Sequence, residues 1–329
     1  MRRREFVGLI GGAVAAWPFA ANAQQTRMRR IGILMSAPED DPEFQGYVTT
    51  FREQLKKFGW TEGDNILFDY RWAALNDATQ ARYAKELVGF QPDLILAQGT
   101  PTTKSLIAET RTLPVIFAIA VDPVGSGFVA SLPKPGGNVT GFTGMEATMG
   151  VKWLELLKEV SPQVTRAAFL FNPTVSTFSN YYLTPFKAAA PSFGVLPIPA
   201  PVRTLTELET VVAEQSREPN GGLIVMPDGF LHVYRAELVS LADRYRLPAV
   251  YAFRFFTEIG GLIAYGNDQA DNYRRSAIYA DKILKGEKPG ELPVQAPERF
   301  ELTINLKTAR SLGLDLSPAL IDRADKVFE

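Results

Sequence analysis

The chain has 329 residues, of which 46% are hydrophobic and 22% charged, and its 35 Lys and Arg nearly balance its 36 Asp and Glu. This length suffices for two domains with separate cores, and the composition is typical of a soluble globular protein. The balanced charge argues against nucleic acid as a partner, and with no cysteine and one histidine, His232, we expect no disulfide, metal site or cofactor.

The first 23 residues are predicted to be an export signal. Three arginines are followed by an apolar stretch, and Ala21-Asn22-Ala23 provides the small residues of a cleavage site. The apolar stretch is too short and too rich in glycine for a stable membrane span. The run from Arg3 to Val7 resembles the twin-arginine signal, with a Sec signal or an uncleaved anchor as alternatives. We therefore expect a periplasmic mature chain that begins at Gln24 and does not insert into a membrane.

From residue 30 onward, short β-branched segments alternate with amphipathic helical patterns, as in βαβ units of a parallel sheet. The first series has strands expected at 31–35, 65–71, 93–98, 114–118 and 139–142, with helices at 43–58, 78–90 and 102–110. The second series has strands expected at 167–171, 195–199, 222–226, 249–251 and 262–265, with helices at 151–160, 176–192, 205–217 and 231–244. The pattern predicts an α/β protein with two doubly wound parallel-sheet lobes.

The C-terminal part adds a helix at 271–285, a strand at 300–304 and two short helices, and fits neither series. We interpret this as a chain that crosses between the lobes three times, near 142–146, 266–268 and 296–299. The N-terminal lobe is then expected to comprise residues 24–143 and 267–297, and the C-terminal lobe residues 144–266 and 298–329. Gly141, Gly144 and Gly266 are expected to absorb the dihedral changes of hinge bending.

Ligands of open parallel sheets bind at the carboxyl ends of the strands, so the residues that follow each strand are candidates for a site. In the first unit, Ser36 and Asp122 follow strands, and Thr100 is placed as the N-cap of a helix. In the second unit the corresponding positions are Asn172, Asp228 and Asn267. Each residue alone could serve only as a turn or cap, but their recurrence in both units favours ligand binding.

Catalytic motifs are absent, since the sequence has neither a G-x-S-x-G elbow nor a phosphate-binding P-loop. His232 falls inside an expected helix and is interpreted as a surface or capping residue. We therefore predict no catalytic residues, although sequence alone does not exclude a pair of carboxylates in the cleft. Six aromatic residues near strand ends are candidates for stacking on a ligand: Phe171, Phe178, Tyr181, Phe230, Tyr251 and Phe253.

Several motifs are spread along the chain, among them Asp122-Pro123-Val124-Gly125, Phe171-Asn172-Pro173 and Gly136-Gly137-Asn138-Val139-Thr140-Gly141. With them, the segment from Arg30 to Glu329 resembles the periplasmic substrate-binding proteins of ABC transporters, in the family that includes tryptophan- and tyrosine-binding members. The resemblance implies a type I periplasmic-binding fold, a small-molecule ligand, and a permease with its ATPase as partners. Some members look like lipoproteins, but no cysteine follows the signal here, which implies a freely diffusing protein.

The sequence thus predicts a monomeric receptor of an ABC importer that binds an amino acid or related carboxylate between its lobes. The helix start at Thr100 could hold an anionic group, and Asp122 or Asp228 an amine. Two alternatives remain open at this point: a secreted enzyme that uses cleft carboxylates, and a ligand-sensing domain that signals to a membrane kinase.

Overall fold

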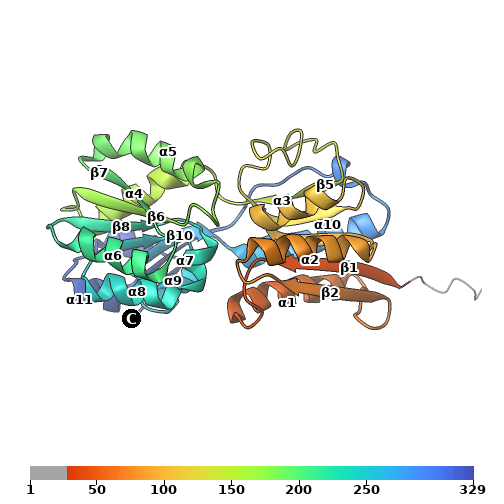
Figure 1. Cartoon of the computed structure of the whole chain (residues 1–329). Coiled ribbons are helices and arrows are strands. Elements are labelled where there is room, and N and C mark those ends of the chain that lie inside the picture. Colours follow the sequence, from red (N-terminus) through yellow and green to blue (C-terminus); the bar gives the residue numbers. More distant parts are fainter. Residues whose placement is uncertain (1–27) are drawn as a thin grey trace, which may run out of the picture.

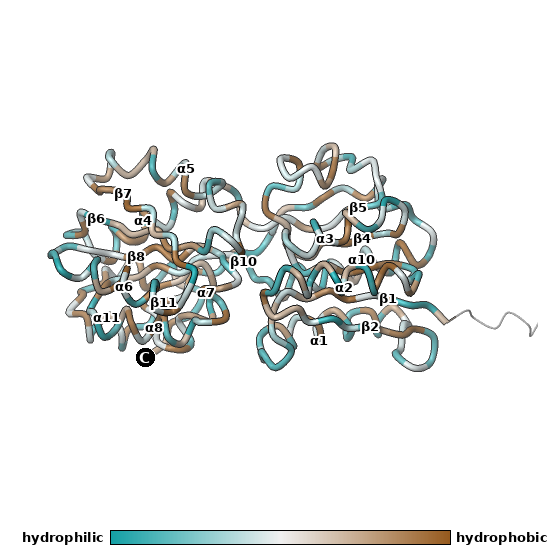
Figure 2. Tube along the Cα trace, viewed as in Figure 1, coloured by the Kyte–Doolittle hydropathy of each residue, from teal (hydrophilic) through white to brown (hydrophobic). Residues whose placement is uncertain are grey.

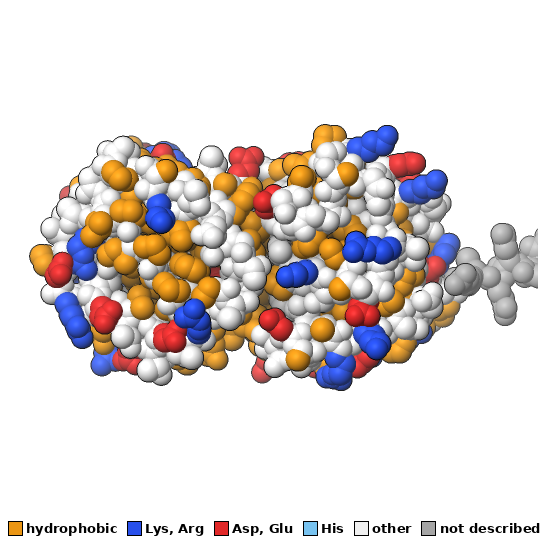
Figure 3. All heavy atoms as spheres, turned by 45° about the horizontal axis from the view of Figure 1, so that its top comes forward, with side chains coloured by type: hydrophobic (Ala, Val, Ile, Leu, Met, Phe, Trp, Pro, Cys, Tyr) orange, Lys and Arg blue, Asp and Glu red, His pale blue; other side chains and the backbone are white. Residues whose placement is uncertain are grey.

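The computed structural model describes residues 28–329, so the predicted export segment lies outside the described residues. Two α/β lobes lie side by side and are connected by extended segments of chain (Figure 1). Along the tube of Figure 2, hydrophobic residues concentrate on the strands inside each lobe. In the view of Figure 3, charged side chains of both signs are spread over both lobes. The predicted α/β fold class with parallel sheets is confirmed.

The N-terminal lobe contains a parallel sheet with the strand order β2-β1-β3-β4-β5. Its strands are β1 (Arg29–Met35), β2 (Ile66–Trp72), β3 (Leu94–Gly99), β4 (Val115–Ala120) and β5 (Val139–Thr143). Its helices are α1 (Pro42–Lys57), α2 (Asp77–Gly89), α3 (Thr100–Glu109) and α10 (Gln269–Leu284). Alternate residues of β1 enter two different cores: Ile33 packs with α1 and α10, and Leu34 packs with α2 and α3. Each face of the sheet is thereby covered by a pair of helices.

The C-terminal lobe contains a sheet with the strand order β12-β11-β10-β9-β8-β6-β7. Its strands are β6 (Arg166–Phe171), β7 (Leu196–Pro201), β8 (Gly221–Val225), β9 (Ala249–Tyr251), β10 (Ile263–Asn267), β11 (Phe300–Asn305) and β12 (Lys326–Phe328). Its helices are α4 (Met149–Val160), α5 (Ser179–Ala189), α6 (Leu205–Ser216), α7 (Gly229–Val233), α8 (Arg235–Arg244), α9 (Arg254–Glu258), α11 (Leu306–Leu312) and α12 (Pro318–Asp322). Two 3₁₀ segments complete the described elements, η1 (Ala190–Phe193) and η2 (Pro289–Glu291).

Several sequence predictions for this lobe need correction. The helix expected at 231–244 is two helices, α7 and α8, which meet at the non-helical Tyr234. The helix expected at 176–192 begins only at Ser179 and ends in η1. Strand β11 runs antiparallel to β10, whereas only parallel strands were predicted. The reason is the chain path, because β10 leads out of the lobe and β11 returns into it along the same edge.

The three crossings between the lobes hydrogen-bond to one another. The backbone N–H of Thr143 donates to the carbonyl of Gln295 (2.8 Å), and the N–H of Asp268 donates to the carbonyl of Arg299 (3.1 Å). Gly141 and Gly266 lie at this junction, and a Cβ atom there would come within 2.1 Å and 1.8 Å of a backbone oxygen, respectively. Close backbone packing therefore requires glycine at both positions, a different reason from the flexibility expected from the sequence.

Strand β7 forms an edge of the C-terminal sheet and carries prolines at alternate positions, Pro197, Pro199 and Pro201. The N–H groups of Leu196 and Val202 donate to the carbonyl groups of Thr165 and Phe171, on the side of the neighbouring strand β6. The direction of the backbone N–H groups alternates along a strand, so the N–H groups at the odd positions between these two residues would point to the free edge. Proline has no N–H, so the prolines leave that edge without donors. Exposed sheet edges template association with other chains, and proline prevents it.

We expect the triple substitution of these prolines by Thr to leave the protein folded but prone to self-association. Static light scattering at increasing protein concentration should show a rising apparent mass for the variant and a constant mass for the parent. If the variant remains as dispersed as the parent, the prolines do not protect this edge.

Candidate functional site

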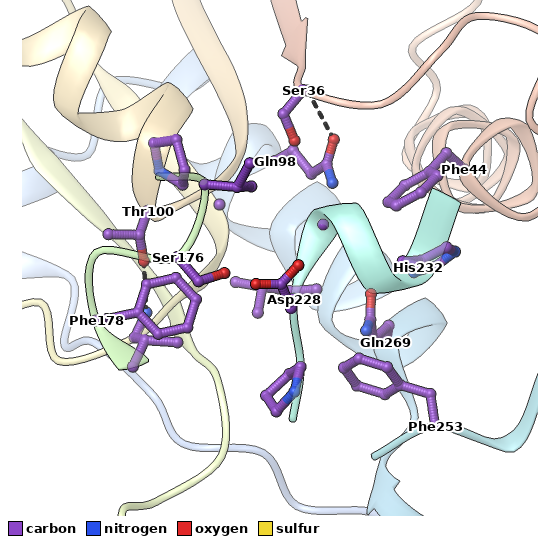
Figure 4. Close-up of a pocket in the computed structure, with 17 residues that line it drawn as sticks. Ser36, Phe44, Gln98, Thr100, Ser176, Phe178, Asp228, His232, Phe253 and Gln269 are labelled. Carbon is purple, nitrogen blue, oxygen red and sulfur yellow. Dashed lines mark hydrogen bonds between the residues drawn. The ribbon is translucent and has the colours of Figure 1, made fainter. Parts of the chain in front are cut away.

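A pocket that is partly open to solvent lies between the lobes. Residues from both lobes line it, at the carboxyl ends of strands and at helix starts (Figure 4). The lining residues are Ser36, Phe44, Gln98, Gly99, Thr100, Pro101, Ile119, Val121, Val175, Ser176, Phe178, Pro227, Asp228, Gly229, His232, Phe253 and Gln269.

On the N-terminal side, the wall is built around the ends of β1 and β3. The Gln98 Oε1 atom accepts hydrogen bonds from the backbone N–H groups of Ser36 (2.8 Å) and Ala37 (3.3 Å), which leaves the amide nitrogen as a donor for a ligand. The Thr100 hydroxyl oxygen accepts from the N–H of Val121 (2.9 Å), so its proton is available to another acceptor. The hydroxyls of Thr102 and Thr103 donate to the Gly99 carbonyl and hold the start of α3 in place.

On the C-terminal side, Asp228 is the central residue. Its carboxylate accepts hydrogen bonds from the N–H of Leu231 (3.0 Å), which caps α7, and from the N–H of Asn172 (2.8 Å). Only 6% of Asp228 is exposed, and this burial raises the pKa of its carboxyl, while the Ser176 hydroxyl and the backbone donors oppose the shift. A ligand ammonium group beside it would favour the ionised form.

The loop after β6 completes this wall. The Asn172 Oδ1 atom accepts hydrogen bonds from the N–H groups of Thr174 (3.0 Å) and Val175 (3.2 Å). This turn brings Ser176 and Phe178 to the pocket, where the Ser176 hydroxyl lies beside the Asp228 carboxylate (Figure 4). Asn172 thus shapes the loop and positions Asp228 through its backbone.

The prediction of a surface or capping histidine is wrong. His232 is 4% exposed and lies between the rings of Phe44 and Phe255, with centroid distances of 4.3 Å and 4.1 Å. Burial, together with the nearby Arg235 guanidinium, lowers the pKa of His232 to about 3. The ring is therefore neutral and forms part of an aromatic wall.

The predicted site residues are only partly brought together. Ser36, Thr100 and Asp228 line the pocket, with two of the predicted aromatic residues, Phe178 and Phe253. Asp122 has a positive φ of 44° and its carboxylate accepts from the N–H of Gly125 (2.9 Å). Asn267 lines a smaller neighbouring pocket, and its buried Nδ2 atom has no partner among residues 28–329.

Sequence reasoning missed four polar or aromatic lining residues: Phe44, Gln98, Ser176 and Gln269. Gln98 immediately precedes the inspected Gly99-Thr100 turn, so attention to the last residue of each strand would have found it. Phe44 and Gln269 lie at helix starts, and nothing in the local pattern distinguishes them from core residues.

The electrostatics of the pocket are simple. Asp228 is the one lining residue with an acidic side chain, and no Lys or Arg lines the pocket in the described part of the chain. An anionic group of a ligand would therefore depend on N–H and hydroxyl donors, and a cationic group would be attracted to Asp228.

Comparison with known proteins gives the family. Residues 33–328 match the family described as ABC transporter substrate binding protein. The chain belongs to this family. As a member it is a substrate-binding protein, which implies a small-molecule ligand and an ABC permease as partner. Among the described residues, no helix combines the length and the apolar character needed to cross a bilayer.

Individual relatives of this substrate-binding protein cover nearly all of it. A tyrosine-binding protein of Clostridioides difficile (strain R20291) is 25% identical over 291 residues, which are 88% of this chain and 82% of that protein. An ABC domain from Streptococcus pneumonia in complex with L-Trp is 26% identical with a TM-score of 0.84, covering 91% of this chain and 99% of that one.

A third relative is also a solved structure. The ligand-free, open structure of a substrate-binding protein from Clostridium difficile is 24% identical, covers the same shares of the two chains, 91% and 99%, and has a TM-score of 0.67.

Proposed function

We propose that this protein captures an amino acid, or a closely related carboxylate that carries an amine, and delivers it to an ABC permease and its ATPase. The observation that carries this proposal is the single acidic side chain of the pocket, Asp228, across the cleft from the start of α3. The amine of one small molecule would bind Asp228 on the C-terminal lobe, and its carboxylate would bind the hydrogen-bond donors on the N-terminal lobe.

In the proposed complex, Asp228 accepts hydrogen bonds from the ligand amine. The ligand carboxylate receives donors from the other lobe, namely the hydroxyls of Ser36 and Thr100, the amide of Gln98 and the N–H groups that open α3. Phe178 and Phe253 supply apolar walls for a side chain. The ligands in the relatives' descriptions, tyrosine and L-Trp, support an aromatic side chain.

Binding at both walls would drive closure, because a ligand shifts a conformational equilibrium only through contacts that improve in the favoured form. No chemical conversion is proposed. An enzyme of the kind considered above would need a second carboxylate, and Asp228 has none beside it in the pocket lining. A ligand-sensing role would use the same pocket, and permease and ATPase genes beside this gene would favour import.

Three further proposals concern the whole chain. Residues 1–23 direct export to the periplasm by the twin-arginine route, the mature chain acts as a monomer, and the lobes divide at the predicted boundaries. Asp122 and Asn267 remain predicted contributors to ligand binding.

A thermal-shift screen tests the proposed ligand class. We expect an aromatic amino acid at about 100 times its Kd to stabilise the protein by about 2.7 kcal/mol, or about 5 °C in Tm. The matched analogue that lacks the amine, such as phenylpropionate for phenylalanine, should give a much smaller shift. Equal shifts from both would exclude the amine contact, and steady conversion of the ligand into a product would exclude a simple receptor.

A further inference from the structure

An ion pair joins the lobes at one edge of the cleft. The Arg235 guanidinium, at the start of α8, donates to both carboxylate oxygens of Asp41, which precedes α1 in the other lobe (2.8 Å and 3.4 Å). The side chains of Asp41 and Arg235 are only 7% and 19% exposed. A bidentate pair shielded from water contributes more than an exposed surface pair. The contact involves protein groups alone and so is independent of any ligand.

An aromatic stack lies directly beside this ion pair. Phe44 from α1 contacts His232 from α7, and His232 contacts Phe255 from α9. Phe44 and His232 are adjacent at one side of the pocket in Figure 4. The lobes also approach closely here, since a Cβ atom at Gly229 would lie 2.9 Å from the Leu75 side chain of the other lobe. We call Asp41, Phe44, His232 and Arg235 the clasp.

Among the residues of the clasp, His232 is the one whose side chain ordinarily gains a proton at weakly acidic pH. The charged groups that act on it are Arg235, which disfavours its protonation, and Asp41, which favours it, while Asp228 caps the same short helix. Burial has the largest effect and holds its pKa at about 3, and its Nε2 atom has no partner in the described structure. Separation of the lobes would remove Phe44 from the ring and admit water, which raises the pKa because burial is its largest cause, while the departure of Asp41 and the retained Arg235 oppose part of this rise.

The sign of the effect follows from proton linkage. Below pH 6.5 the open form binds a proton at His232 more readily than the closed form does, so closure becomes less favourable as the pH falls. Between pH 7.5 and 5.5 one such group changes the closed-to-open ratio by at most about tenfold.

We propose that the clasp closes the cleft in the absence of ligand, and that protonation of His232 releases it. A low pH then favours the open form and weakens ligand retention. The clasp thus adds a pH response to the receptor that does not depend on which ligand it carries.

Labels on both sides of the cleft can test the proposal without any ligand. The chain has no cysteine, so Lys104→Cys on α3 and Lys187→Cys on α5, both exposed, provide two unique attachment points for fluorophores. Single-molecule energy transfer then reports the closed-to-open ratio. We expect this ratio to fall from pH 7.5 to 5.5 in the parent protein, by at most about tenfold.

Variants separate the two parts of the clasp. His232→Phe keeps a ring in the stack and should abolish the pH response, with His232→Gln as a second variant should Phe not fold. Asp41→Asn should lower the closed fraction at both pH values. Glu62→Gln, which breaks the exposed pair with Arg52 within one lobe, should change neither the closed fraction nor its pH response. An unchanged ratio in the parent, or a full pH response in both His232 variants, would overturn the proposal, whatever the ligand of the receptor is.

Discussion

The Asp228→Asn variant is expected to bind the ligand ten- to a hundredfold more weakly than the parent while remaining folded. Asn retains a side-chain oxygen for the N-cap of α7, but its amide nitrogen replaces the oxygen that accepts from the N–H of Asn172, so circular dichroism and the Tm of the variant must first establish that it is folded. The ligand amine then loses the negative charge of a cleft whose described lining has no second acidic side chain. A charge-assisted hydrogen bond of this kind contributes about 1.5 to 3 kcal/mol, and calorimetry with the ligand identified by the thermal screen measures the change.

The matched control is Asp325→Asn. The Asp325 carboxylate also accepts a backbone hydrogen bond, from the N–H of Leu302 (2.7 Å), but it belongs to the far side of the C-terminal lobe and does not line the cleft pocket. We expect this variant to bind as the parent does. Asp122→Asn in the same experiment tests whether that carboxylate contributes as predicted. Parental affinity of a folded Asp228→Asn protein would refute the proposed amine contact.

The Gly266→Ala variant is expected to lose more than about 3 kcal/mol of unfolding free energy, or to fail to fold. A Cβ atom at this position would lie 1.8 Å from the carbonyl oxygen of Ala252 and 3.1 Å from the Met145 sulfur. Overpacking a core commonly costs about 1 to 3 kcal/mol, and here the obstacle is backbone that cannot rotate away. Urea denaturation of parent and variant provides the measurement.

Gly46→Ala is the control for this substitution. Gly46 lies on α1, and a Cβ atom added there would meet no other atom within 4 Å, so Ala should raise stability by about 0.5 to 1 kcal/mol through helix propensity. If Gly266→Ala unfolds at the parent's urea concentration, the strands at the junction are less tightly packed than the structure indicates. That result would support the flexible hinge expected from the sequence.

Much of the architecture follows from local sequence patterns. Alternation of short apolar strands with amphipathic helices predicted parallel sheets, because side-chain spacing determines which local structure buries the apolar groups. The ends of those strands then pointed to Ser36, Thr100 and Asp228, since parallel strands in one sheet end on the same edge. These three residues do line one pocket between the lobes.

Local sequence patterns did not predict the contacts between distant segments of the chain. His232 was interpreted as a surface or capping residue because its neighbours in sequence suggested only a helix, yet it is buried by Phe44 from the other lobe. The Asp41–Arg235 pair joins residues 194 positions apart, and the antiparallel pairing of β11 depends on the return path of the chain. The sequence by itself determined most helices and strands and the strand ends near the site, since these depend on neighbouring residues. Only the tertiary structure decided which of those ends share a pocket and what closes over it, because burial and charge at a site depend on every segment packed around it.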